Sequence, residues 1–435
     1  MRNGVALVLL VVLSSVMLPV GAADWPQWRG PNRDGKSAET GLLKEWPESG
    51  PPRAWKASGI GAGYSSVSVA KGRIFTMGDL ADGQYVFALA EKDGSLLWKS
   101  RVGVVHEDKY PGPRCTPTVD GDRIYVMTTE GDVVSLEAAT GNELWRRSLP
   151  GDFDGYLMKA MGSYEWKFSE SPLVDGDRVV VTPGHHAAMM VALDKKSGEE
   201  IWRTTGRHHL GERGADGAGY SSVIVSEAAD TRQYVQLVGR GLIGVEATNG
   251  KLLWSYNRVA SDIANISMPI VAGERVFASA GYGTGAGLLE IGKGEDGYEA
   301  KEIYFLEADT LQNHHGGLIL HDGTLYTGTG HNKGFPIAVD FATGEVAWGP
   351  ERNDGTDSAA VSYADGRLYF RYQNGVMILV EANAEEYRER GSFLIPDVVL
   401  QSWPHPVIAN GKLLLREQDD LHCYDITAKA PSSSE

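Results

Sequence analysis

Histidine is concentrated in a few parts of this 435-residue chain, and the distribution points to a binding site. Nine of the 11 histidines fall in long segments between predicted strands or at the strand starts that follow: His106, His185, His186, His208, His209, His314, His315, His331 and His405. Histidine, tyrosine and carboxylate carried on loops of a rigid scaffold are typical of a ligand site. The alternative is that these loops hold more histidines only because they are longer.

The best candidates for ligand contact are the residues expected at strand starts, nearest the centre of the fold. They are Tyr64, Arg114, Glu170, Tyr220, His314, His315 and His405, with His331 from a neighbouring loop. No catalytic set can be identified among them, so no residue is assigned a catalytic role.

A metal site is not predicted. Zinc needs three or four ligands at about 2.0–2.3 Å. Six of the histidines form adjacent pairs: His185-His186, His208-His209 and His314-His315. A strand points neighbouring side chains to opposite faces, so each pair offers at most one convenient ligand. The run Gly281–Gly287 is interpreted as a loop, because nothing helical follows it and it lacks the lysine of a phosphate-binding loop.

A repeat reveals the elements that would position these residues. One phrase recurs: an apolar strand, an acidic residue, a turn ending in glycine and, four residues later, tryptophan. It reads FALAEKDGSLLW to Trp98, VSLEAATGNELW to Trp145, VALDKKSGEEIW to Trp202, IGVEATNGKLLW to Trp254 and IAVDFATGEVAW to Trp348. Each unit opens with two further strands around a tight turn, as in VDGDRIYV. Four short strands per unit, A to D, are typical of β-propeller blades.

The number of units predicts eight blades. Successive tryptophans lie about 50 residues apart, and the gap before Trp348 is about twice that, so it holds a degenerate blade with Tyr304 or Phe305 as its aromatic residue. Two more units follow, the first with Phe393 in that position. The last unit lacks a D strand, which residues 53–59 are predicted to supply. Pairing of the two chain ends would remove exposed sheet edges.

We therefore predict an all-β, eight-bladed β-propeller of four-stranded antiparallel blades. Residues 24–52 would form an N-terminal lead-in, 53–430 the single propeller domain and 431–435 a disordered tail. Tryptophan rings packed between blades each bury roughly 150–250 Å²; the docking tryptophans are Trp55, Trp98, Trp145, Trp202, Trp254 and Trp348. The acidic residues of the phrase are expected to accept hydrogen bonds from the turn that follows: Glu137, Asp194, Glu246 and Asp340.

Propeller geometry separates the loops by end. The A–B and C–D turns emerge at one end of the ring and are nearly all minimal here. The B–C and D–A loops emerge at the other end and are long: Arg101–Pro113, Pro150–Phe168, Thr204–Gly219 and Ala280–Gly287. We therefore expect the histidine-rich binding site at the B–C and D–A end.

The N-terminus and the charge suggest where the protein works. Arg2, the apolar run Val5–Val20 and the small residues before position 23 are typical of a cleaved signal peptide, residues 1–23. A periplasmic or secreted protein without a stable membrane anchor follows, and we expect a monomer. The net charge of −16, with no basic stripe, argues against nucleic acid as a partner. Cys115 and Cys423 fall in blades that are not neighbours, so two buried free thiols are expected rather than a disulfide.

The repeat resembles that of pyrroloquinoline-quinone (PQQ) dehydrogenases and of the outer-membrane assembly factor BamB. The opening Asp24–Pro31, DWPQWRGP, is similar to that of secreted propellers of this family from bacteria such as planctomycetes. The resemblance implies the propeller fold, and either a BamB-like role in protein binding or quinoprotein chemistry with PQQ and calcium. Two departures count against the dehydrogenase: no Cys-Cys pair occurs, and its glutamate–asparagine–aspartate calcium set cannot be placed here.

Our leading prediction is therefore a binding or scaffold propeller outside the cytoplasm, for a protein partner or an extracellular ligand, without an assigned cofactor. The alternative is a PQQ-dependent quinoprotein oxidoreductase of the alcohol dehydrogenase type, in which the cofactor carries the redox chemistry.

Overall fold

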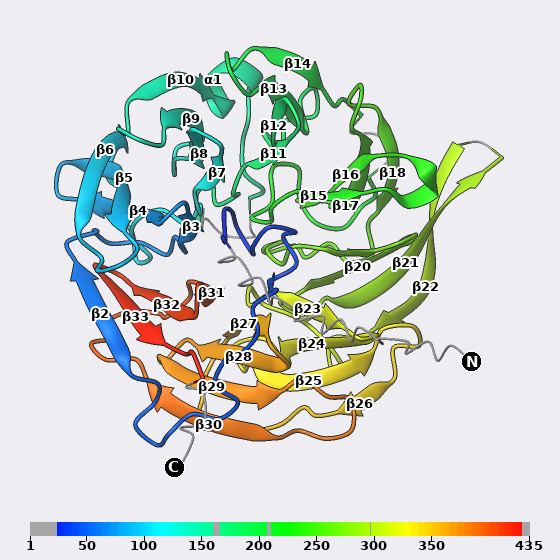
Figure 1. The fold of residues 1–435 in the computed structure, drawn as a ribbon. Coiled ribbons are helices and arrows are strands. Elements are labelled where there is room, and N and C mark those ends of the chain that lie inside the picture. The colour runs from blue at the N-terminus through cyan, green and yellow to red at the C-terminus, as the bar shows by residue number, and fades with distance from the viewer. Residues whose placement is uncertain (1–23, 160–165, 207–209, 296, 429–435) are drawn as a thin grey trace, which may run out of the picture.

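The computed structural model describes residues 24–159, 166–206, 210–295 and 297–428, which form eight sheets arranged around a central axis (Figure 1). Seven sheets have four strands, and the eighth has a fifth strand, β1 (Lys36–Ser37), which adds in parallel to an otherwise antiparallel blade. Within each blade the strands follow the order A to D from the axis outward. The predicted eight-bladed, all-β propeller is confirmed. The predicted signal peptide, residues 1–23, and the predicted tail, residues 431–435, lie outside the described residues.

The strands of each blade are short. Blades 1 to 4 are β3–β6 (Ser68–Ala70, Arg73–Leu80, Gly83–Ala90, Leu96–Gly103), β7–β10 (Thr118–Asp120, Arg123–Met127, Asp132–Glu137, Glu143–Ser148), β11–β14 (Leu173–Asp175, Arg178–Val181, Val191–Asp194, Glu200–Arg203) and β15–β18 (Ile224–Ser226, Gln233–Val238, Gly241–Glu246, Leu252–Tyr256). Blades 5 to 7 are β19–β22 (Ile270–Ala272, Arg275–Ala280, Gly285–Gly294, Gly297–Leu306), β23–β26 (Leu318–His321, Thr324–Thr329, Phe335–Asp340, Val346–Trp348) and β27–β30 (Ala359–Ala364, Arg367–Tyr372, Val376–Glu381, Glu389–Leu394). Blade 8 is β31–β33 (Val407–Ala409, Lys412–Glu417, Asp420–Asp425) with β2 (Arg53–Ser58). A helix α1 (Leu149–Phe153) and a 3-10 turn η2 (Ala228–Asp230) lie in connections.

The N-terminal strand closes the ring, as predicted. β2 pairs antiparallel with β33, with Trp55 opposite Cys423. On the inner side of the same junction the buried Arg416 of blade 8 reaches blade 1, donating to Thr76 Oγ1 at 2.6 Å and to the carbonyl of Gly61 at 2.9 Å. Strand pairing and a buried arginine therefore join the first blade to the last.

Aromatic rings pack onto glycines of the next blade. A Cβ placed on Gly94, Gly141, Gly198 or Gly250 would come within 2.8 Å of the indole of the preceding blade, respectively Trp55, Trp98, Trp145 and Trp202. Because glycine has no side chain, the flat ring can lie directly on the backbone of the turn. Tyr304, and not Phe305, takes this role in degenerate blade 5, since it contacts Gly344 in the next blade.

Trp254 departs from this arrangement. Its indole lies against Gly244 of its own blade and its Nε1 donates to Gln233 Oε1 at 2.5 Å. In the next blade the C and D strands form a long hairpin of ten residues each, β21 and β22, which extends from the ring in Figure 1. The glycines of that hairpin, Gly292, Gly294 and Gly297, do not lie against the Trp254 ring.

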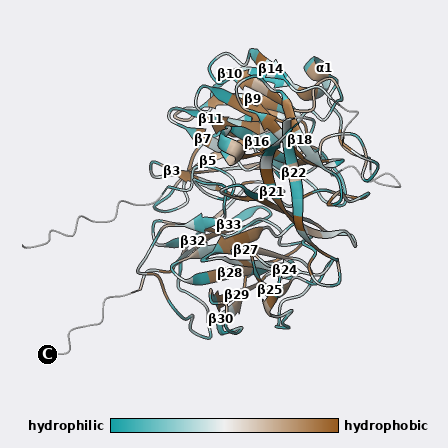
Figure 2. Ribbon diagram, turned by 90° about the vertical axis from the view of Figure 1, so that its right-hand side faces the viewer, coloured by the Kyte–Doolittle hydropathy of each residue, from teal (hydrophilic) through white to brown (hydrophobic). Residues whose placement is uncertain are grey.

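The core is built between neighbouring blades. The B and C strands are buried along almost their whole length, as in β8 and β9, and the clusters of buried side chains join strands of adjacent blades. Figure 2 accordingly shows hydrophobic segments in both halves of the ring, not gathered at one end. The acidic residues of the repeat act as predicted: Asp194 accepts from the Ser197 amide at 2.8 Å, and Asp340 from the Thr343 amide at the same distance. Cys115 and Cys423 are buried free thiols, as expected.

The A strands begin two to five residues later than predicted, since the expected starts lay near Tyr64, Arg114, Glu170, Tyr220, Asn265, His314, Asp357 and Trp403. The A strands begin at Ser68, Thr118, Leu173, Ile224, Ile270, Leu318, Ala359 and Val407. The backbone just before them bonds to the neighbouring blade: the Tyr64 amide donates to Pro113 O at 2.8 Å and the Tyr220 amide to Asn265 O at 2.7 Å. These segments therefore form a belt of hydrogen bonds around the channel, and the candidate residues lie on that belt.

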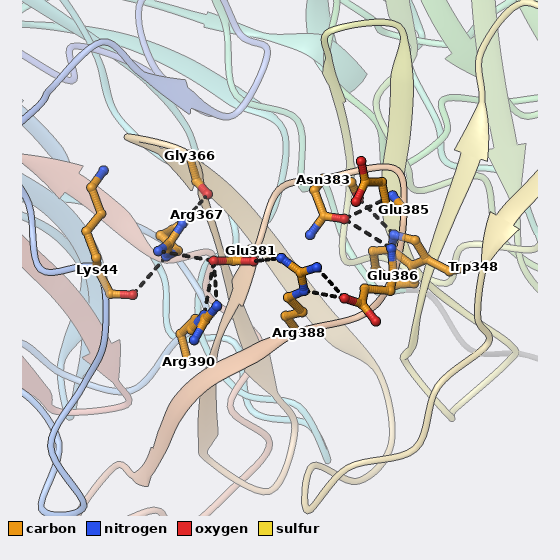
Figure 3. Close-up of polar contacts among 10 residues, drawn as sticks. All are labelled: Lys44, Trp348, Gly366, Arg367, Glu381, Asn383, Glu385, Glu386, Arg388 and Arg390. Carbon is orange, nitrogen blue, oxygen red and sulfur yellow. Dashed lines mark hydrogen bonds and ion pairs between the residues drawn. The ribbon is translucent and has the colours of Figure 1, made fainter.

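Residues 24–52, which we call the strap, cross the A–B and C–D end of the ring (Figure 1, blue). Trp25 pairs with Val69 of blade 1, Lys36 with Tyr363 of blade 7, and the Leu43 amide donates to Ile426 O beyond blade 8 at 2.8 Å. Its later part is held by the charged cluster in Figure 3. Arg367 Nε donates to Lys44 O at 2.9 Å, while Glu381 accepts from the surrounding arginines.

Candidate functional site

A cavity of about 320 Å³ opens at the B–C and D–A end of the channel, opposite the strap. Seven of the eight predicted contact residues line it: Tyr64, Arg114, Tyr220, His314, His315, His331 and His405. They come from different blades and meet because the belt before the A strands surrounds the axis. We call this cavity the cup. Whether these residues bind a ligand stays a prediction.

Glu170 does not line the cup. It is 3% exposed and lies behind the belt, where its carboxyl accepts from the Thr182 amide at 2.8 Å and from Gln236 Nε2 at 3.3 Å. Burial raises the pKa of Glu170 to about 8, against the opposing effect of the Thr182 hydrogen bonds and the nearby Arg33. The group is a buried acid that ties blades 3 and 4 together. His208 and His209 lie outside the described residues.

Aromatic side chains that the sequence analysis did not single out form much of the wall. Trp403 lies against Tyr64 and Tyr110, with ring centroids 4.7 and 4.9 Å apart. Elsewhere on the wall Trp166 meets Tyr220 edge to face at 5.5 Å. All five line the cup. Three of them, Tyr110, Trp166 and Trp403, come from the long D–A connections. These connections therefore supply large flat aromatic surfaces to the cavity.

The histidines of the cup are held neutral by burial. Burial, with a smaller effect of neighbouring imidazoles, lowers the pKa of His314 to about 2 and of His315 to about 3. His314 also lies 2.9 Å from the Tyr282 hydroxyl and 2.6 Å from Ser358 Oγ through its two ring nitrogens. Neutral imidazoles in fixed hydrogen bonds position a ligand but carry no charge at neutral pH.

His405 shows how strongly one imidazole is fixed. Arg29 approaches its Nδ1 at 3.5 Å, so Nδ1 is the acceptor, and Nε2–H donates to His315 O at 3.2 Å. The side chain is 6% exposed. Burial, followed by the charge of Arg29, lowers the pKa of His405 to about 3.

We expect His405→Gln to reduce the acid sensitivity of the fold. The folded-state pKa lies below the unfolded value near 6.5, so the unfolded chain binds the proton more readily and stability falls as pH drops below about 6.5. The single group accounts for at most about 2 kcal/mol of unfolding free energy lost between pH 7.5 and 5. Urea unfolding at the two pH values measures the difference.

The control for this prediction is His186→Gln, at an exposed histidine outside the cup. It should keep the wild-type difference between pH 7.5 and 5. A His405→Gln protein that loses as much stability on acidification as the wild type would contradict the assignment of a buried neutral imidazole.

The strap forms the floor of the cup. Trp28 and Arg29 line the cavity from below, and the Trp28 ring lies 4.5 Å from His405. Arg29 donates to the carbonyls of Leu318 and Asp34, and Arg33 to those of Val223 and Ser171, from inside the channel. Both arginines are less than 5% exposed. The channel is therefore closed at the strap end and open at the other.

The sequence offered one signal for this floor. The segment Asp24–Pro31 was noted only as a family resemblance, yet its tryptophan and arginine at positions 28 and 29 fill the channel. Gly30, at φ +84°, lies against the Trp25 ring and turns the strap inward.

Calcium with a quinone cofactor does not fit the residues of the cup. Calcium takes six to eight oxygen ligands, with carboxylates among them, whereas Asp357 is the one carboxylate among the described residues that line the cup. Within the described ranges no group of three or more histidine, cysteine or acidic side chains is arranged to hold a metal ion. Cys115 and Cys423 lie in different blades and cannot bridge over a cofactor.

No helix in the described part of the chain has the length and apolar character needed to cross a membrane.

Comparison with known proteins agrees with the fold. A curated BamB from Nitrosomonas eutropha is 24% identical over 184 residues, which span 42% of this chain and 38% of that protein.

Two solved structures share the architecture. BamB from Moraxella catarrhalis superposes with a TM-score of 0.55 at 15% identity, over 82% of this chain and 95% of that one. The quinohemoprotein alcohol dehydrogenase from Comamonas testosteroni gives 0.62 at 12% identity, over 95% and 82%. The family model described as outer membrane protein assembly factor BamB matches residues 82–349. The chain therefore belongs to this BamB-like family of PQQ-like β-propellers.

Proposed function

We propose that this protein is a binding propeller that works outside the cytoplasm and takes a ligand into the cup. The observation that carries the proposal is the cup itself: an aromatic cavity at the open end of a channel whose other end is filled by Trp28, Arg29 and Arg33. A cavity of about 320 Å³ lies within the size range of small-molecule sites. The N-terminal apolar run supports the location, as does the membership of the outer-membrane protein assembly factor BamB in the same family.

Catalysis is not part of the proposal. Burial keeps His314, His315 and His405 neutral, and His314 is held by the side chains of Ser358 and Tyr282. The acid Glu170 is turned away from the cup toward Thr182. The dehydrogenase likeness supports the fold alone, since the cup does not supply the carboxylates that a calcium-bound quinone needs.

Trp403→Ala is expected to weaken ligand binding while leaving the fold intact. Trp403 forms the centre of the aromatic wall and is anchored by its Nε1 donating to Gln373 Oε1 at 2.7 Å. Losing one stacked ring costs about 1–3 kcal/mol of binding, a factor of about 5 to 150 in Kd. A fragment library of mixed charge, screened by thermal shift and then titration calorimetry, compares wild type, Trp403→Ala and Trp403→Phe.

The phenylalanine variant is the matched control, because it keeps a flat ring in place and should retain most of the affinity. Near-ultraviolet circular dichroism without ligand checks that the ring is intact in each variant. If no compound of any charge raises the melting temperature of the wild type more than that of Trp403→Ala, the cup is not a ligand site.

A further inference from the structure

The charge of the cup is opposite in sign to that of the whole molecule. The chain carries a net charge of −16. Yet among the described residues two arginines, Arg29 and Arg114, line the cup against one carboxylate, Asp357. The surrounding histidines are uncharged, so they do not add to the positive potential or cancel it. A low-dielectric cavity with one sign of charge concentrates ligands of the opposite sign.

The two arginines differ in what they can offer. Arg29 lies in the floor, and its guanidinium donates to the carbonyls of Leu318 and Asp34. It therefore adds positive electrostatic potential to the cup but has few N–H donors left for a ligand. Arg114 lies in the side wall, half-buried, and donates to the carbonyls of Gly112 at 2.6 Å and Tyr110 at 2.7 Å. A guanidinium has five N–H donors, so donors remain for a ligand.

No carboxylate among the described residues pairs directly with Arg114. Both of its hydrogen-bond partners are backbone carbonyls, and Asp108 and Asp79 act on it only as nearby charges. Burial lowers its pKa to about 10, which leaves it charged at neutral pH. A buried charge is normally paired within the protein, and guanidinium is the side chain best matched to a carboxylate.

Flat rings lie beside this charge. The guanidinium carbon of Arg114 is 5.7 Å from the centre of the Tyr64 ring. Tyr64 in turn stacks with Trp403, which contacts Tyr110. One unpaired cation at the edge of an aromatic wall is complementary to a planar molecule that carries one negative group at its rim.

We propose that the cup binds a small organic acid, a carboxylate carried on a flat one- or two-ring body. Arg114 receives the carboxylate, and Tyr64, Tyr110 and Trp403 pack against the ring. No metal takes part. The inference rests on the proposed function and names the ligand class of the same cavity.

The test uses three probes of one shape. They are 2-naphthoate, 2-naphthamide and 2-naphthylmethylamine, which are anionic, neutral and cationic. Titration calorimetry on the full chain is expected to give at least tenfold tighter binding of the naphthoate than of the amide, and the weakest binding of the amine. Arg114→Gln should weaken naphthoate binding about 10- to 100-fold, since a charge-assisted hydrogen bond is lost, and leave the amide within about twofold.

Arg53→Gln is the matched control, because Arg53 is an exposed arginine on β2 at the outer edge of blade 8. It should leave all three affinities unchanged. Raising the salt concentration should weaken the naphthoate alone.

The outcomes separate this inference from the proposed function. Equal affinity for the three probes, unaltered by Arg114→Gln and lost in Trp403→Ala, would overturn the organic-acid inference and leave the binding function standing. Naphthoate binding that survives both Arg114→Gln and Trp403→Ala would place the probe elsewhere and also overturn the inference. Failure of every probe and of the whole mixed-charge library would overturn the proposed function itself.

Discussion

Replacing Glu417 by alanine is expected to lower the free energy of unfolding by about 3–5 kcal/mol, because it leaves a buried guanidinium without its counter-charge. Arg371 and Glu417 lie 2.7 Å apart with side chains 0% and 1% exposed. Ser402 bridges them, since it accepts from Arg371 Nε at 2.9 Å and donates to Glu417 Oε2 at 2.5 Å. The pair connects β28 of blade 7 to β32 of blade 8, so its loss also loosens the junction next to the ring closure.

Urea unfolding followed by tryptophan fluorescence measures the effect. The double variant Arg371→Met with Glu417→Leu should recover most of the loss, since removing both charges removes the cost of desolvating either. Glu143→Ala, which breaks an exposed pair with Arg146, is the surface control and should cost less than about 1 kcal/mol. A loss for Glu417→Ala no larger than that of Glu143→Ala would show that the buried pair does not hold the two blades together.

Gly250→Ala is expected to destabilise the propeller by several kcal/mol, through two separate effects. Gly250 has a φ of +76°, which costs an alanine about 1–2 kcal/mol. The new Cβ would also lie 2.4 Å from the Trp202 ring, so the indole must leave its place between blades 3 and 4. Displacing a large buried ring costs about 3–5 kcal/mol when the space cannot collapse.

Gly72→Ala separates the two effects. Gly72 has nearly the same φ, +73°, but no atom lies within 4 Å of a Cβ built there. It should therefore show the backbone cost alone, about 1–2 kcal/mol. Thermal and urea unfolding of both variants give the comparison. If the two substitutions cost the same, contact of the indole with the glycine turn contributes nothing to blade docking.

Much of the fold could be predicted from the sequence because the repeat is local. The acidic residue, the glycine and the tryptophan of each phrase lie within one C–D hairpin, and the same hairpin recurs around the ring. Trp254 could not be predicted to differ. Its position depends on the next blade, where β21 and β22 form a longer hairpin whose glycines do not lie against the ring. The observed A strands start later than predicted for a related reason. The belt residues bond to a different blade, and the sequence of one repeat unit contains no information about that pairing.

The candidate site was found in part. Seven predicted residues meet in the cup because propeller geometry brings every segment before an A strand to the axis. Glu170 occupies an equivalent position in the chain, yet its side chain points behind the belt toward Thr182. Trp403 and Tyr110 were missed because long loops carry no periodic pattern. Trp28 and Arg29 were missed because the strap reaches the channel only through tertiary contacts with blades far away in the sequence.

Blade 8 combines β2 with β31–β33, which are far apart in the chain, and this affects when the ring can close during folding. β2 is among the first strands to be synthesised, and its partner β33 is the last. Because synthesis runs from the N-terminus, β2 has no strand to pair with in blade 8 until β33 has been made. The ring closes only after β33 has been synthesised, so a nascent chain that stops before β33 leaves β2 without its antiparallel partner and blade 8 incomplete.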